Sequence, residues 1–330
     1  MRLKNKRILF LYSGGHSVHL AFAKSIGAKI MSLSKKIPKD YDIYITEAKY
    51  IPLTIQKYLG NLKKGSKIIN LFADPRMYYL NKRIFFDQKR NKVKKYPTLK
   101  RIASIFLLKK LNGVLCVGEL VRDLLKNINK KIPSKVVYSF ISENRLKQLI
   151  KITPKLNNQK IIFIGSGPDW HYKGLDILIK TFKILKKEFP NIEINIIGDW
   201  KNISNLNLKG FSFEGIQKDI KKYLKNSSLM VHLGRGDTFP VSTIEAMNAG
   251  IPVIISKDTG TREIVNKVRK DFVVDLNPLE VSDKIREYFN LPLKEKKILS
   301  KKFREEGKKF NEKDMLRLFK IKFKELMGEI

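Results

Sequence analysis

The stretch that decides the fold class is GRGDTFPVSTIEAMNAGIPVIIS, residues 234–256. It follows the apolar run SSLMVHL, residues 227–233, which is typical of a buried strand. A loop with one carboxylate, Asp237, then leads into a helix that begins around Ser242 and carries a second carboxylate, Glu245. A second buried strand, PVIIS, completes a β-α-β unit. Such units predict a parallel sheet in an α/β fold.

The predicted loop and helix start suit a ligand that carries both phosphate and hydroxyl groups. Backbone N–H groups and the macrodipole at a helix N-terminus favour an anionic group. Carboxylates beside such a site accept charge-assisted hydrogen bonds from neutral hydroxyls. We therefore expect a nucleotide sugar to bind near Asp237 and Glu245. The alternative is a solvated pair of acids on an ordinary β-α unit.

The same stretch resembles the acidic-x7-Glu signature of retaining glycosyltransferases of the glycosyltransferase 4 type, also described as glycosyl transferases group 1. The residues that match the family pattern are Phe239, Pro240, Glu245, Ala246, Met247, Gly250, Pro252 and Val253. Asp237 replaces the usual first Glu, which keeps the charge and shortens the side chain by one methylene. The resemblance implies the GT-B architecture, in which two Rossmann-like, doubly wound parallel-sheet domains face each other across a cleft.

The rest of the chain fits this architecture, because short apolar runs alternate with helical segments along its 330 residues. We expect an N-terminal acceptor domain at residues 1–150 and a C-terminal donor nucleotide-sugar domain at 160–310. The segment 151–159 loses its periodicity and contains a proline, which predicts a linker. The resemblance implies that the basic helix at 311–330 packs back on the first domain. No apolar run approaches the ~20 residues that span a bilayer.

A second family motif lies in GSGPDWHYKGLDILIKTF, residues 165–182. It resembles the family's strand, loop and Lys-Gly-Leu-Asp segment, in which the Lys contacts the donor diphosphate. The match implies this role for Lys173 and a place in the donor-binding site for Gly165 at the strand end. A Lys at a helix start suits a diphosphate whose negative charge grows as the sugar leaves. The alternative is a solvated Lys in a chain rich in Lys.

One position departs from the family pattern. The family commonly has an Arg directly after the strand's glycine, also on the diphosphate, where this chain has Ser166. Arg and Lys are not equivalent at such a bidentate site. Arg235 is our candidate to approach the phosphates from the next loop, with His171 as a lesser candidate. Without such compensation, we expect slow turnover or binding without turnover.

The resemblance also implies roles at the helix start. Glu245 would accept hydrogen bonds from the ribose hydroxyls, and Asp237 would contact hydroxyls of the transferred sugar. Phe239, Val241 and Ser242 can offer backbone N–H groups to sugar or phosphate, whereas a proline cannot. We expect Lys173, Asp237 and Glu245 to carry the catalytic chemistry.

In the first half, SGGHSVH (residues 13–19) follows the first predicted strand. Gly14 and Gly15 resemble the paired glycines of many GT-B enzymes, where the backbone approaches donor phosphate or acceptor closely. Ordinary turn chemistry is the alternative. His16 is a candidate hydrogen-bond partner for a substrate hydroxyl or phosphate. The DxD string at residues 40–42 precedes a strand of the first domain, far from the predicted donor site, so we expect no metal site there. The resemblance implies that the reaction requires no metal.

The chain is strongly basic, with a formal net charge of +37. Residues 1–150 hold 33 Lys and Arg against 8 Asp and Glu, whereas residues 151–330 hold 35 against 23. The basic segment 89–111 combines a charge run with an apolar patch, which suits an anionic membrane surface. A solvated loop leading into a core helix is the alternative. No recognisable nucleic-acid module accompanies the charge, so we do not expect nucleic acid as a partner.

The resemblance implies a hexosyltransferase that moves a sugar from a nucleotide diphosphate sugar to a glycan or lipid-linked acceptor with retention. We expect no cofactor besides the donor substrate, and a place in cell-surface glycan biosynthesis. The single cysteine, Cys116, excludes an internal disulfide and suits a reducing cytoplasm, where the chain would work at the inner face of the membrane. The alternatives are a non-catalytic sugar-nucleotide-binding protein, a nucleotide-sugar epimerase and a basic nucleic-acid-binding protein.

Overall fold

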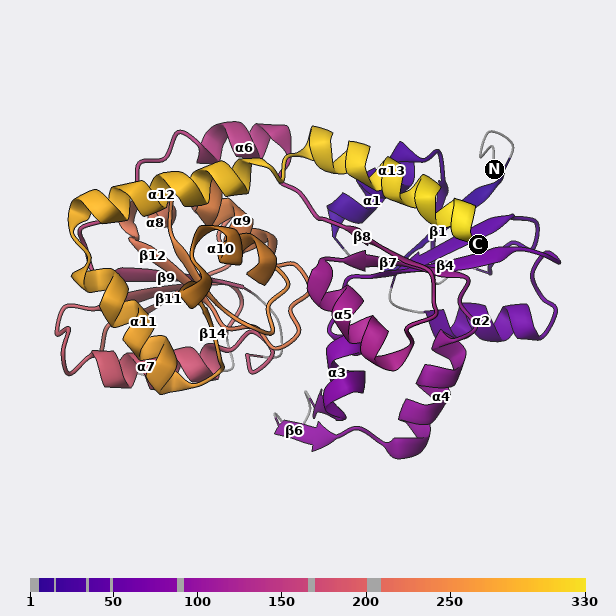
Figure 1. The fold of residues 1–330 in the computed structure, drawn as a ribbon, viewed down its shortest axis with the longest axis horizontal. Coiled ribbons are helices and arrows are strands. Elements are labelled where there is room, and N and C mark those ends of the chain that lie inside the picture. The colour runs from indigo at the N-terminus through magenta and orange to yellow at the C-terminus, as the bar shows by residue number, and fades with distance from the viewer. Residues whose placement is uncertain are drawn as a thin grey trace. The chain divides into compact units, whose positions relative to one another are not determined.

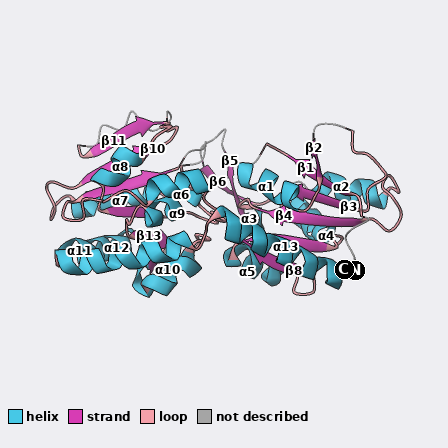
Figure 2. Cartoon of the chain, turned by 90° about the horizontal axis from the view of Figure 1, so that it is seen from above, coloured by secondary structure: helices cyan, strands magenta, loops and turns pink. Residues whose placement is uncertain are grey.

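The structure is a computed structural model that describes residues 6–14, 16–33, 36–47, 50–87, 92–165, 170–200 and 209–330. The chain divides into two compact units. Unit 1 comprises residues 1–85, 93–139 and 312–330, and unit 2 comprises residues 86–92 and 140–311. Each unit is built on its own parallel sheet with helices on both faces (Figures 1 and 2). The predicted α/β class with two parallel-sheet domains is therefore confirmed.

The sheet of unit 1 has six strands in the described residues, and all of its pairings are parallel. In pairing order they are β2 (Lys29–Ser32), β1 (Ile8–Tyr12), β3 (Ile43–Glu47), β4 (Lys67–Phe72), β7 (Gly113–Val117) and β8 (Ser134–Val137). The helices are α1 (Ser17–Ser25), α2 (Tyr50–Tyr58), α3 (Arg76–Lys82), α4 (Thr98–Leu108), α5 (Glu119–Ile128) and α13 (Glu312–Glu329). A separate two-stranded sheet joins β5 (Ile84–Asp87) to β6 (Lys92–Lys95).

The central strands of unit 1 are apolar because helices cover both faces of the sheet. Every residue of β3 and β7 is buried, including the polar Glu47 at the end of β3. The last helix, α13, packs on this unit: Phe319 stacks on Phe22 of α1, with ring centroids 4.3 Å apart. A side chain placed at Gly113 of β7 would contact Leu326, so α13 lies close against the sheet. The yellow α13 is seen beside α1 and β8 in Figure 1.

The sheet of unit 2 is also six-stranded and parallel within the described residues. In pairing order its strands are β11 (Phe211–Gly215), β10 (Glu193–Ile197), β9 (Lys160–Ile164), β12 (Leu229–His232), β13 (Val253–Ser256) and β14 (Val273–Val274). Its helices are α6 (Glu143–Leu149), α7 (Leu175–Leu185), α8 (Lys221–Asn226), α9 (Val241–Asn248), α10 (Arg262–Val268), α11 (Pro278–Asn290) and α12 (Leu293–Lys308).

The strand order of unit 2 determines where a ligand can bind. When the strands are numbered within the unit, their order is the Rossmann order 3-2-1-4-5-6. The strand order reverses between β9 and β12, while all strands stay parallel. At such a switch point the loops after the two strands leave toward opposite faces, and a crevice opens at the carboxyl edge of the sheet. The glycine after β9, Gly165, and the loop Gly234–Asp237 after β12 both lie at this edge.

The predicted linker at 151–159 belongs to unit 2. The chain passes between the units at 139/140 and 311/312 instead, and the short segment 86–92 is also grouped with unit 2. Ile152 and Leu156 are buried, and the guanidinium of Arg304 donates a hydrogen bond to the carbonyl of Ile152 at 2.6 Å. Two buried apolar side chains and this hydrogen bond therefore hold the irregular segment in its unit. Among the described residues, no helix combines the length and the apolar character needed to cross a membrane.

Candidate functional site

The loop after β12 carries Asp237 to the switch point of unit 2. Backbone hydrogen bonds fix this loop to the one after β13: Gly236 N–H donates to Asp258 O at 2.8 Å, and Gly260 N–H donates to Asp237 O at 2.7 Å. The two loops are so close that a Cβ on Gly260 would lie 1.6 Å from the carbonyl oxygen of Thr238. Residue 260 must therefore be a glycine, and the contact between the two loops fixes the position of Asp237.

Asp237 is the centre of a buried polar network. Its Oδ2 accepts from Lys173 Nζ at 2.7 Å and lies 2.8 Å from His232 Nε2. Its Oδ1 accepts from the hydroxyl of Tyr172 at 3.3 Å. The imidazole of His232 is fully buried and stacks on Phe163. The structure therefore brings together Lys173 and Asp237, which were predicted separately.

The charges around Asp237 keep it ionised. Burial on its own would raise the pKa of this carboxyl, but Lys173 and His232 outweigh that effect and hold the pKa well below its ordinary value. The lysine ammonium retains further donor positions, because an ammonium group has three N–H bonds. Lys173 can therefore bind an anionic ligand without leaving Asp237.

The position of Lys173 depends on the glycine that follows it. Gly174 has φ +76°, and a Cβ there would lie 1.8 Å from the carbonyl oxygen of Leu233. No other residue fits this backbone at this distance. The glycine joins the start of α7 to the end of β12. It thereby sets the lysine beside Asp237.

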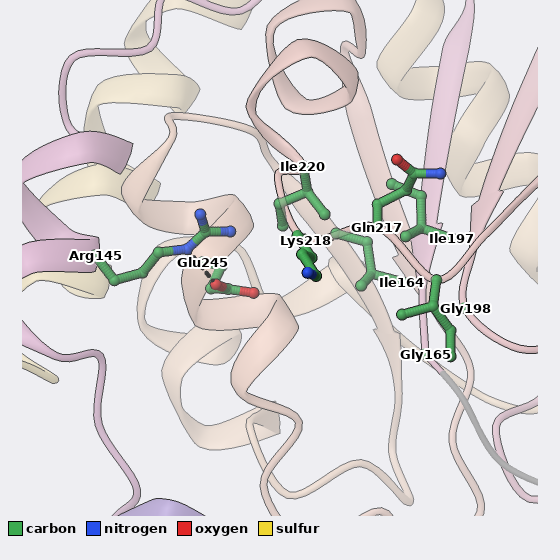
Figure 3. A pocket seen from close by; sticks show the side chains of 10 residues that line it. Arg145, Ile164, Gly165, Ile197, Gly198, Gln217, Lys218, Ile220 and Glu245 are labelled. Carbon is green, nitrogen blue, oxygen red and sulfur yellow. Dashed lines mark hydrogen bonds and ion pairs between the residues drawn. The ribbon is translucent and has the colours of Figure 1, made fainter.

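A cavity of about 410 Å³ lies at the same edge of the sheet, over β9, β10 and β11. Figure 3 shows the side chains that surround it. Its lining residues are Arg145, Ile164, Gly165, Ile197, Gly198, Ile216, Gln217, Lys218, Ile220 and Glu245. Four isoleucines provide apolar walls, and a small number of polar groups can fix the orientation of a ligand. This composition and size are typical of a small-molecule site.

Glu245 on α9 is the carboxylate of this cavity. Its Oε1 accepts from Arg145 Nε at 2.7 Å, and the two side chains are 18% and 22% exposed. In Figure 3 the side chains of Arg145 and Glu245, which both line the pocket, point toward each other. Arg145 comes from α6, one hundred positions earlier in the chain. Only Oε1 takes part in this ion pair.

Gly165 joins the cavity to the Asp237 network. It lines the cavity, and a Cβ placed on it would lie 3.7 Å from Lys173 Cδ. The hydroxyl of Ser242, near the start of α9, donates to the carbonyl of Ile164 at 3.3 Å. The predicted residues Gly165, Lys173 and Ser242 thus lie around the end of β9.

Arg235, the first candidate to replace the missing family Arg, forms an ion pair within unit 2. Both Nη atoms of Arg235 donate to the carboxylate of Asp176, each at 2.8 Å, and Nη1 also donates to the carbonyl of His171. The guanidinium is therefore committed to a bidentate ion pair at the start of α7. Ser166 lies outside the described residues.

The remaining predicted residues, Phe239, Val241 and Ser242, lie at the start of α9 or just before it. Val241 and Ser242 are the first residues of α9, whose opening N–H groups have no partner within the helix. Phe239 is buried, with its ring centroid 5.7 Å from that of Phe310. Thr243 donates its hydroxyl to the carbonyl of Pro240 at 2.7 Å, which fixes the first turn.

The first unit has a polar cluster at its own switch point, between β1 and β3. His16 caps α1, and its Nδ1 accepts from the backbone N–H of Val18 at 3.4 Å. His19 Nδ1 lies 2.6 Å from Oε1 of the buried Glu47. Oε2 of Glu47 accepts from both the backbone and the hydroxyl of Ser13, each at 3.0 Å.

This cluster orders the loop that contains the predicted glycines. Burial alone would raise the pKa of Glu47, but hydrogen bonds from His19 and Ser13 hold it below the ordinary value. Gly14 has φ +86°, and Gly15 lies outside the described residues. His16 is exposed beside them.

Both aspartates of the DxD string, Asp40 and Asp42, form ion pairs with basic residues. Asp40 pairs with Arg7, and Asp42 accepts from Lys63 Nζ at 2.6 Å and from the backbone of Arg7 at 2.8 Å. Across the parts of the chain that the structure describes, no three His, Cys, Asp or Glu gather as metal ligands. Asp74 forms a turn, in which its Oδ1 accepts from Arg76 N–H at 2.9 Å.

Several site residues had no distinguishing sequence signal. Arg145 lies outside every motif, and Gln217 and Lys218 follow an edge strand of ordinary composition. The sequence pattern predicts a buried strand at His232 and a loop at Tyr172, and neither pattern marks a binding site. Both residues lie close to a recognised motif residue, because Tyr172 directly precedes Lys173 and His232 lies five positions before Asp237.

Comparison with known proteins agrees with this geometry. The family model of glycosyl transferases group 1 matches residues 144–310, slightly more than half of the chain. An uncharacterised glycosyltransferase of Methanocaldococcus jannaschii is 31% identical over 150 residues, which cover 43% of this chain and 37% of that protein. One from Haemophilus influenzae is 26% identical over 160 residues, covering 46% and 44%. The chain thus spans less than half the length of these two relatives.

Solved structures share the whole architecture at low identity. Sucrose-phosphate synthase from Thermosynechococcus elongatus superposes with a TM-score of 0.72 at 13% identity, covering 99% of this chain and 100% of that one. Anabaena HepE in complex with UDP-glucose gives 0.70 at 16% identity, covering 97% and 100%. These neighbours are GT-B glycosyltransferases. The chain therefore has the GT-B fold and belongs to the glycosyl transferases group 1 family.

Proposed function

We propose that the protein transfers a hexosyl unit from a nucleotide diphosphate sugar to a hydroxyl of a glycan or lipid-linked acceptor, with retention at the anomeric carbon. The observation that carries the proposal is the arrangement around the end of β9. An apolar cavity with one carboxylate, Glu245, lies on one side of Gly165, and the cation Lys173 lies on the other. A nucleoside and a diphosphate need these two environments next to each other.

The cavity suits the nucleoside. The isoleucine walls offer apolar surface to a flat base, and the side chain of Gln217 and the backbone at Gly198 offer polar contacts for its edge. Glu245 accepts hydrogen bonds from the two ribose hydroxyls through Oε2, while Arg145 holds Oε1. A ribose bound in this way directs its 5′ carbon toward Gly165.

The diphosphate lies between Lys173 and the start of α9. The ammonium group of Lys173 and the N–H groups of Val241 and Ser242 neutralise the charge that grows on the leaving phosphate. Asp237 keeps Lys173 in place and presents its remaining acceptor capacity to hydroxyls of the transferred sugar.

Retention is proposed through same-face attack. Asp237 already accepts from Lys173 and Tyr172 and contacts His232, so it is poorly placed to act as a nucleophile. The bond from the anomeric carbon to the phosphate oxygen breaks while the bond to the acceptor oxygen forms. The proton of the acceptor hydroxyl passes to the departing diphosphate.

The acceptor is proposed to use the polar loop at the switch point of unit 1. Ser13 and His16 are exposed there, and the buried Glu47 orders the loop beneath them. HepE is described in complex with UDP and glucose, and TarM in complex with UDP, fondaparinux and α-GlcNAc-glycerol. These ligands support a nucleotide-sugar donor and a glycan acceptor for this chain. We place the reaction in the cytoplasm, in the assembly of cell-surface glycans.

The proposal is tested by incubating the purified chain with UDP-, GDP- and ADP-sugars and extracted lipid-linked glycans, in the presence of a chelator. We expect one donor class to release its nucleoside diphosphate in proportion to glycoside formed, and proton NMR of the product to give the anomeric configuration of the donor. Donor binding is measured in parallel by calorimetry. Binding with no transfer to any acceptor would support a non-catalytic sugar-nucleotide-binding protein. Inversion of the anomeric carbon would contradict the retaining mechanism.

A further inference from the structure

Helix α4 of unit 1 exposes three large apolar side chains to solvent. Leu99, Ile102 and Phe106 are 84%, 56% and 53% exposed. Residues advance by about 100° around a helix, so these three lie within about 60° of one another and form a stripe. The opposite side of α4 is covered by the unit, where Ser104 and Leu108 are buried. The helix is therefore apolar on its inner and its outer face.

Lysines surround the stripe. Lys100 and Lys109 lie on its two sides, and Lys110 follows it, with Nζ 5.0 Å from the centroid of the Phe106 ring. All three lysines are exposed. Residues 92–111 contain seven Lys and Arg and no Asp or Glu. We call the three apolar side chains and these three lysines the α4 surface.

We propose that the α4 surface docks on an anionic lipid membrane. An interfacial helix buries its apolar side chains about 5–10 Å into the boundary between headgroups and acyl chains. The lysine stems can lie along apolar surface while their ammonium groups reach the lipid phosphates. A nucleic acid would neutralise the lysines but leave the aliphatic Leu99 and Ile102 without a partner. An anionic bilayer satisfies both the charge and the apolar stripe.

Another basic helix of the chain supplies a matched comparison. Helix α12 carries Lys297, Lys301 and Lys302, all exposed. Its exposed apolar residues, Leu293 and Ile298, are 43% and 49% exposed but are separated by about 140° around the helix. It therefore has lysines without a stripe. Neutralising three lysines on either helix changes the net charge equally, which separates a specific surface from the general attraction of a chain with charge +37.

The test is co-sedimentation of the full chain with phosphatidylcholine vesicles, with and without 30% phosphatidylglycerol, at about 150 mM salt. We expect binding to the anionic vesicles alone. The triple variant K100Q/K109Q/K110Q should bind them at least tenfold more weakly, since each basic residue contributes about fivefold. The variant L99S/I102S/F106S should lose a similar factor. The control variant K297Q/K301Q/K302Q should stay within about twofold of the original chain. Thermal unfolding checks that each variant is folded.

Several results would overturn the proposal. These are equal binding to neutral and anionic vesicles, an equal loss in the α12 control, and full binding by the serine variant. A chain that ignores vesicles but binds duplex DNA or an acidic protein through the same lysines would assign the surface to that partner instead. No nucleotide sugar is present in this experiment, so its outcome is independent of the proposed sugar transfer.

Discussion

At the scale of single residues, the site rests on two carboxylates in different states. Asp237 is nearly enclosed by Lys173, His232 and Tyr172, whereas Glu245 shares one oxygen with Arg145 and faces the cavity. The first acid therefore orders Lys173, which the proposed function places on the diphosphate, and the second keeps Oε2 for the proposed contact with ribose. The methylene lost at Asp237 relative to the family pattern is consistent with this enclosed position.

Glu245→Gln should weaken binding of the cognate nucleoside diphosphate by about tenfold or more, because a hydrogen bond to a charged group contributes about 1.5–3 kcal/mol. Isothermal titration calorimetry measures this loss directly. Glu305→Gln is the control, since that carboxylate is exposed on α12. An unchanged affinity for Glu245→Gln would remove this residue from the ribose site.

Asp237→Asn should destabilise the fold by about 3 kcal/mol at pH 7, because it leaves Lys173 without its buried partner. The pKa of Asp237 is lowered in the folded chain, so its stabilisation is complete above the ordinary carboxyl pKa near 4 and declines as the pH falls toward the folded value. The stability difference between the original chain and the variant should therefore shrink between pH 5 and pH 3.

Urea unfolding at pH 7, 5, 4 and 3 measures this difference. Asp275→Asn is the matched control, because its ion pair with Lys257 is exposed and should contribute less than about 1 kcal/mol. A difference that stays constant across this pH range would show that Asp237 has an ordinary pKa.

At the scale of helices and strands, glycines set how closely the elements approach. Gly174 and Gly215 both have positive φ, at +76° and +66°. A Cβ on Gly174 would collide with a backbone carbonyl of the neighbouring loop, whereas a Cβ on Gly215 would meet nothing within 4 Å. The same substitution should therefore have two very different costs.

Gly215→Ala should cost about 1–2 kcal/mol, the ordinary penalty of a left-handed backbone. Gly174→Ala should cost clearly more and should also weaken donor binding, because the loop that carries Lys173 must move. Chemical denaturation and calorimetry test both effects. Equal costs at the two positions would mean that the approach of α7 to the end of β12 is looser than described.

Helix α13 is predicted to be essential to unit 1. Phe319→Ala removes a ring that is buried and stacked on Phe22, and should lower the free energy of unfolding by about 3–5 kcal/mol. Ile321→Ala, on the same helix but 47% exposed, should cost less than about 1 kcal/mol. If both variants unfold alike, α13 does not stabilise the unit through this contact.

At the scale of the whole molecule, much of the fold followed from local pattern. Buried strands such as IIFIG and PVIIS are continuous apolar runs bounded by glycine or proline, and parallel sheets covered on both faces require such runs. The partially exposed edge strand β2 and the short helices α3 and α6 lacked this signal. The segment 151–159 resembles a linker in sequence because it is mostly polar and contains Pro154, yet its two isolated apolar residues, Ile152 and Leu156, are buried in unit 2.

The site was predictable only where its residues are close in sequence. Asp237 and Glu245 share one β-α unit, and Lys173 stands in a motif of its own, so pattern was enough to mark them. Arg145 reaches Glu245 across one hundred positions, and that pairing depends on tertiary structure. The ion pair between Arg235 and Asp176 joins residues 59 positions apart and likewise depends on tertiary structure.

The central claim is that unit 2 holds the nucleoside diphosphate at the carboxyl edge of its sheet. A crystal structure of the chain with UDP-glucose, or with the donor selected by calorimetry, tests it most directly. The account predicts the base between the isoleucine walls of the cavity, the ribose hydroxyls on Glu245 and the diphosphate on Lys173. A donor bound elsewhere, with this cavity empty, would contradict it.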